Sequence, residues 1–127
     1  MSHYYHQDDL KKIPELVQLA PHASSSFLAF EQEVYTSTGA IPLKTKELIA
    51  VAVAHVTGCP YCIDTHVQRY KELGGTPEEI VEAVLVAATT RAGAVLSHAT
   101  QALIAFNRPH PLRTIEGNGS TEPECFC

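Results

Sequence analysis

The chain has 127 residues, of which 45% are hydrophobic and 18% are charged, and its formal net charge is −5. These values fit a single soluble globular domain and exclude an intrinsically disordered chain. An acidic chain without a long Lys/Arg run is also a poor candidate for binding nucleic acid or an anionic membrane surface.

No uninterrupted apolar run approaches the roughly 18 residues that a membrane span requires. The longest such run extends from Leu48 to Ala54, and the polar N-terminus lacks the apolar core of a signal peptide. We therefore expect a cytoplasmic protein that does not cross a membrane. In that reducing compartment, closely spaced cysteines more often serve catalysis or metal binding than structure.

Apolar and Ala-rich segments recur at helical spacing between turns that contain Gly or Pro, and no strand-like alternation interrupts them. Helices are expected after Pro14, over 24–35, over 43–56, from 60 to the Gly74-Gly75 stop, and from 76 onward. Thr76, Pro77 and Glu79 give the last of these a capping-box spacing with Pro at the first helical position.

Thr89, Thr90 and Gly93 predict a break or a kink, after which a final helix runs to about Phe106. The predicted fold class is all-α, a single-domain helical bundle of about five to six helices over 1–106. Residues 107–127 are rich in Pro, Gly, Asn, Ser and Thr and are expected to form a flexible C-terminal tail.

Cys59 and Cys62 form a Cys-x-x-Cys pair at the expected start of a helix. Residues three apart share a helix face, so the two sulfurs can form a disulfide. The positive helix N-terminus favours the thiolate, which is the species that attacks peroxides and disulfides. His66 follows Cys62 by four residues on the same face, where it can accept a thiol proton or stabilise a thiolate as imidazolium.

Glu47 precedes Cys59 by twelve residues, on the preceding expected helix. If the two helices pack antiparallel through a turn at Gly58, the carboxylate can point toward the dithiol. A partly desolvated carboxylate there would suit a proton-relay base. The alternative interpretation is a solvated acid in the first turn of its helix, where the dipole favours it.

Taken together, Glu47, eleven residues, Cys-x-x-Cys, three residues and His66 match a family pattern, and Gly74-Gly75-Thr76 follows downstream. The stretch 42–106 resembles the core of the alkylhydroperoxidase D and carboxymuconolactone decarboxylase family, in the branch that contains the cysteine pair. Full-length alkylhydroperoxidase D proteins are longer and often carry His between the cysteines, where this chain has Tyr61.

The resemblance implies an all-helical homo-oligomer, a trimer or hexamer, that reduces hydroperoxides without an organic cofactor or a metal. In the implied scheme Cys62 attacks the peroxide, Cys59 resolves the sulfenic acid to a disulfide, His66 and Glu47 move protons, and an external thiol or dithiol restores the pair. Helix-dipole reasoning alone favours Cys59 as the more acidic thiol, so both orders stay open. We favour Cys62, because a base one turn away should outweigh a dipole effect of about 0.3–1 kcal/mol.

Two other functions remain open at this stage. Cys59, Cys62 and His66 could bind a metal in a structural or sensor module, although the core offers no second nearby Cys/His pair. A non-redox decarboxylase or isomerase could also use the same fold, with thiols that are inert.

Four further residues are weaker candidates. His55, one turn before Cys59, is either a hydrogen-bonded core residue or a supporting catalytic group. Tyr61 is expected to be a wall of the site or an interface residue. Cys125 and Cys127 are either incidental in a disordered tail or a mobile auxiliary dithiol.

Overall fold

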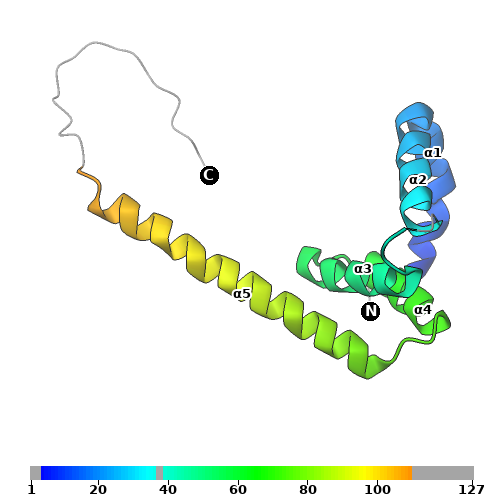
Figure 1. Cartoon of the computed structure of the whole chain (residues 1–127). Coiled ribbons are helices and arrows are strands. Elements are labelled where there is room, and N and C mark those ends of the chain that lie inside the picture. Colours follow the sequence, from blue (N-terminus) through cyan, green and yellow to red (C-terminus); the bar gives the residue numbers. More distant parts are fainter. Residues whose placement is uncertain (1–3, 37–38, 110–127) are drawn as a thin grey trace, which may run out of the picture.

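The computed structural model describes residues 4–36 and 39–109, and all the regular elements in these ranges are helical. They are η1 (Gln7–Lys12), α1 (Ile13–Leu19), α2 (Pro21–Thr36), α3 (Leu43–Thr57), α4 (Pro60–Glu72) and α5 (Pro77–Asn107). Figure 1 shows α3 and α4 side by side, while much of α5 extends away from them. The predicted all-α fold is confirmed.

The turn between α3 and α4 brings the two central helices together. Gly58 has a φ of 71°, a left-handed conformation that only Gly adopts readily, and its N–H donates to the carbonyl of Ala54. Cys59 then caps the N-terminus of α4 and Pro60 occupies the first helical position. The dithiol therefore lies at the start of a helix, as the sequence predicted.

A second tight turn joins α4 to α5. Thr76 caps α5 by accepting the N–H of Glu79 at 3.2 Å, which confirms the predicted helix start. Tyr70 is buried and its hydroxyl donates to the Glu79 carboxylate. A side chain at Gly75 would collide with the Tyr70 ring, so this close approach requires glycine.

The predicted break in the last helical segment is wrong, because α5 is a continuous helix of 31 residues. The hydroxyls of Thr89 and Thr90 both donate to the carbonyl of Val86, at 2.8 and 2.9 Å. Their polar groups are thus satisfied within the helix instead of competing with it. Gly93 costs about 1 kcal/mol relative to Ala in a helix, which so long a helix tolerates.

One helix was not anticipated as a candidate membrane span. By length and composition alone α5 could cross a membrane. The core helix of a soluble protein passes the same test. Small and hydroxylated residues interrupt the apolar ones in this segment, so it contains no long uninterrupted apolar run.

Full burial among the described residues is confined to Glu47, Val51, Ala54 and Tyr70, which lie on α3 and α4. Glu47, Val51 and Ala54 share one face of α3, whereas Ile49 and Val53 on the same helix are exposed. No described residue of α5 is buried, and its Leu96 is 75% exposed. An isolated chain therefore leaves large apolar faces in water.

Candidate dithiol active site

Cys59 and Cys62 meet at the N-terminus of α4. The Sγ atom of Cys59 accepts the backbone N–H of Cys62 at 3.3 Å, so the thiol itself is the helix cap. A hydrogen bond from the Cys62 thiol, followed by this N–H, lowers the pKa of Cys59. The same thiol hydrogen bond, together with burial and the charge on Cys59, raises the pKa of Cys62 to about 11. Of the two thiols, Cys59 is therefore the one that ionises at lower pH.

His66 is held by a buried carboxylate from the neighbouring helix. Its Nδ1 lies 2.6 Å from Oε2 of Glu47, whose residue is 2% exposed. A carboxylate only accepts, so Nδ1 donates, and in the neutral ring Nε2 is left as the basic nitrogen. Arg69 places a cation 3.9 Å from the other carboxylate oxygen. The predicted approach of Glu47 to the dithiol helix is present.

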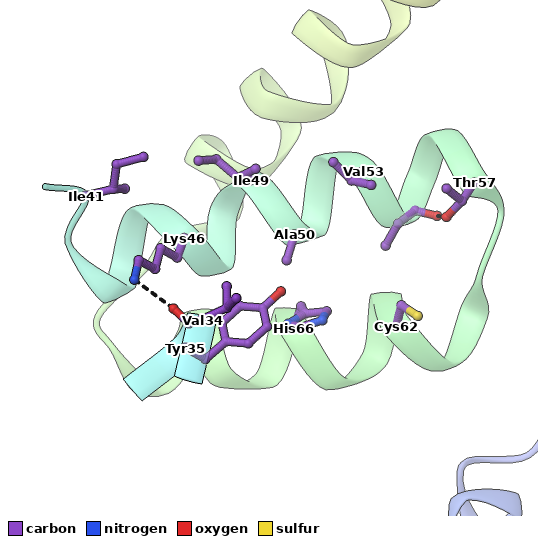
Figure 2. Close-up of a pocket in the computed structure, with 11 residues that line it drawn as sticks. Val34, Tyr35, Ile41, Lys46, Ile49, Ala50, Val53, Thr57, Cys62 and His66 are labelled. Carbon is purple, nitrogen blue, oxygen red and sulfur yellow. Dashed lines mark hydrogen bonds between the residues drawn. The ribbon is translucent and has the colours of Figure 1, made fainter. Parts of the chain in front are cut away.

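An apolar cavity of about 440 Å³ opens beside this pair (Figure 2). The nucleophile and the base in its lining are Cys62 and His66, whereas Cys59 does not line the cavity. The other lining residues come from α2, α3 and the segment before α3: Val34, Tyr35, Ile41, Lys46, Ile49, Ala50, Val53, Ala54 and Thr57. A mainly apolar ligand placed here would meet Cys62 before Cys59.

Tyr61, between the two cysteines, ties the N-terminal segment to α4. Its hydroxyl donates to the carboxylate of Asp9 at 2.7 Å, and the ring of Tyr5 packs edge-on against it with centroids 5.4 Å apart. Tyr61 does not line the cavity. It therefore does not form a wall of this cavity and instead contacts the N-terminal segment.

The remaining candidates are not brought to the dithiol. Nδ1 of His55 donates to the carbonyl of Val51 at 2.7 Å, and the ring borders a separate hollow with Arg91. Cys125 and Cys127 lie outside the described residues, as does most of the predicted tail. Within residues 4–36 and 39–109, no group of three or more His, Cys, Asp or Glu side chains is arranged to hold a metal ion.

Two residues near the site were missed by the sequence analysis. Arg69 follows His66 by three residues on α4, so helical spacing could have indicated it. Tyr35 comes from α2, and its ring lies against that of His66 with centroids 5.3 Å apart. No local pattern connects Tyr35 to the Cys-x-x-Cys segment, because the contact depends on how α2 packs.

Comparisons with known proteins agree with this architecture. Residues 21–105 match the model of the carboxymuconolactone decarboxylase family, and the chain belongs to that family. It is 53% identical over 78 residues to "Uncharacterized protein 4 in cox locus" of Paracoccus denitrificans, covering 61% of this chain and 69% of that protein. An uncharacterized protein of Cupriavidus necator is 32% identical over 92 residues, covering 72% of this chain and 80% of its own.

A crystal structure of a protein from Methanobacterium thermoautotrophicum shares the fold. Its TM-score is 0.64 at 31% sequence identity, and the similarity covers 73% of this chain and 99% of that one. A solved structure therefore shows the same overall helical arrangement as this chain.

The asymmetry of the thiols predicts an order of alkylation. At neutral pH iodoacetamide should modify Cys59 before Cys62, because thiolate forms at lower pH on the cysteine whose pKa is lowered. Replacing Cys62 with Ala should slow alkylation of Cys59, since the hydrogen-bond donor is lost. Cys59→Ala should accelerate alkylation of Cys62. Peptide mapping over a pH series measures both rates, and earlier modification of Cys62 in the unaltered protein would contradict this assignment.

Proposed function

We propose that the protein is a thiol-dependent hydroperoxide reductase that cycles between the Cys59/Cys62 dithiol and its disulfide. The observation that carries the proposal is the position of Cys62 in the apolar cavity, one turn from a His66 that Glu47 orients. Cys59 lies beside Cys62 but does not line the cavity. It can therefore attack an oxidised Cys62, but a bulky substrate in the cavity reaches it less easily. Membership of the carboxymuconolactone decarboxylase family does not by itself establish a peroxidase activity.

In the first step Cys62 gives its proton to Nε2 of His66, and its thiolate attacks the terminal oxygen of the hydroperoxide. An S–O bond forms as the O–O bond breaks, leaving a sulfenic acid on Cys62 and an alkoxide that becomes an alcohol on protonation. Glu47 stabilises the imidazolium that forms on His66, because its buried carboxylate already accepts the Nδ1 proton.

In the second step the Cys59 thiolate attacks the sulfenic sulfur of Cys62. An S–S bond forms, the S–O bond breaks, and the departing hydroxide takes the proton from His66 to become water. An external thiol or dithiol then reduces the disulfide by exchange. The lowered pKa of Cys59 favours this step, because the thiolate is the species that attacks the sulfenic sulfur.

The dithiol mechanism predicts that both cysteines are needed for full turnover. In the reduction of tert-butyl hydroperoxide with dithiothreitol, Cys62→Ser should abolish turnover, and Cys59→Ser should slow it strongly because the external thiol must then reduce the sulfenic acid directly. After removal of dithiothreitol, one equivalent of peroxide should leave a sulfenic acid on Cys62 in Cys59→Ser, whereas the unaltered protein should lose about 2 Da as Cys59–Cys62 forms. Intact mass and peptide mapping distinguish these species.

Asp64→Asn provides a matched control, because Asp64 is an exposed residue on the same helix and makes no contact with the dithiol. It should retain turnover. Full turnover in either cysteine variant would refute the mechanism.

We also propose that the protein acts in the cytoplasm as a homo-oligomer, a trimer or hexamer. The exposed apolar residues of α5 support self-association. Specific interfaces between subunits bury about 1,000 Å² or more, and apolar surface of this kind is what they cover. A helix of this composition can be covered by other copies of the chain as readily as by lipid.

Light scattering on the purified protein should therefore give a mass several times the 13.8 kDa of the chain. Leu103→Glu, on the exposed apolar surface of α5, should reduce that mass by placing a charge in the interface. Lys71→Glu, on the charged surface of α4, is the control and should not. A monodisperse monomer of the unaltered protein in detergent-free buffer would exclude the oligomer.

A further inference from the structure

Tyr35 is the one tyrosine of the described residues that stands in the dithiol cavity. It is half-buried at the end of α2, and its ring packs against His66 at an angle of 31° with centroids 5.3 Å apart. Figure 2 shows the side chain beside His66, between α3 and α4. Cys62, His66 and Tyr35 thus face the same space from two helices.

The hydroxyl of Tyr35 differs from those of the two tyrosines on α4 in its hydrogen bonding. Tyr61 donates to Asp9, and Tyr70 donates to Glu79. The Tyr35 hydroxyl makes no hydrogen bond to any of the described residues, so its donor is available to a ligand in the cavity. Burial and then the charge of Glu47 raise the pKa of Tyr35, which keeps the phenol protonated at neutral pH.

We propose that Tyr35 is a further catalytic residue, whose hydroxyl donates a hydrogen bond to the inner oxygen of a hydroperoxide and gives its proton to the departing alkoxide. This inference rests on the proposed peroxidase function. As the O–O bond breaks, the electron pair goes to the alkoxide oxygen, the phenol proton follows it to form the alcohol, and the resulting phenolate recovers a proton from water at the open side of the cavity. The proton of Cys62 stays on His66 for the hydroxide released in the resolving step.

The division of labour follows from charge. His66 must be neutral to take the Cys62 proton, so it does not also supply one at the moment of bond cleavage. Among the described residues that line the cavity, the other proton-bearing groups are Thr57, whose hydroxyl donates to the carbonyl of Ala54, and Lys46, whose ammonium donates to the carbonyl of Val34. Of these donors, Tyr35 is the one whose ring packs against His66, the residue that takes the Cys62 proton.

The test is the rate of Cys59–Cys62 disulfide formation in a single turnover of reduced Tyr35→Phe protein. The substitution keeps the ring against His66 and removes only the hydroxyl. With tert-butyl hydroperoxide, whose alkoxide is strongly basic, the rate should fall about 10²-fold. With peracetic acid, whose carboxylate leaving group needs no proton, it should change less than about threefold by the same reasoning. Tyr4→Phe, which removes an exposed hydroxyl remote from the cavity, should match the unaltered protein with both oxidants.

Equal slowing with both oxidants would overturn the inference, because a loss of packing does not depend on the leaving group. An unchanged rate with tert-butyl hydroperoxide would also overturn it, and would leave the peroxidase proposal intact. Failure of the unaltered protein to form the disulfide with either oxidant would remove the peroxidase proposal and this inference with it.

Discussion

The hydrogen bond between the buried carboxylate of Glu47 and Nδ1 of His66 constrains the whole site. A carboxylate that is 2% exposed costs several kcal/mol unless it is paired, so α4 must present a cation or a strong donor to α3 at this level. That requirement fixes which face of α4 turns toward α3. Cys62, one turn before His66 on that face, is thereby directed into the cavity that α2 and α3 complete.

The two cysteines acquire different properties although they are three residues apart. Cys59 is the N-cap of α4 and receives hydrogen bonds from the thiol and the backbone of Cys62, and these hydrogen bonds lower its pKa. Cys62 lies inside the first turn, keeps its proton and borders the cavity. The sulfur that borders the cavity is thus the one whose pKa is raised, so a base near Cys62 becomes necessary. His66 supplies this base, which explains why the dipole argument and the proposed order of attack point to different cysteines.

Local signals were sufficient for much of this architecture. The stop at Gly58, the cap at Thr76 and the spacing of Glu47 to His66 each depend on a few neighbouring residues, and the structure places them as the sequence predicted. The unbroken α5 was missed because the Thr89 hydroxyl donates to the backbone carbonyl of Val86, a contact that composition does not reveal. Tyr35 was missed for a different reason, since its place in the cavity comes from packing between α2 and the α3–α4 pair.

The most direct measurement of the central claim is the single-turnover rate of disulfide formation by tert-butyl hydroperoxide in the Glu47→Gln variant. Glutamine keeps an acceptor for Nδ1 of His66 and nearly the same volume, but it does not stabilise the imidazolium that forms when Cys62 loses its proton. We expect the rate to fall about 10²-fold, the usual effect of losing general acid–base assistance. The helical circular dichroism of the variant should be unchanged. A folded Glu47→Gln protein that forms the disulfide as fast as the unaltered one would contradict this account.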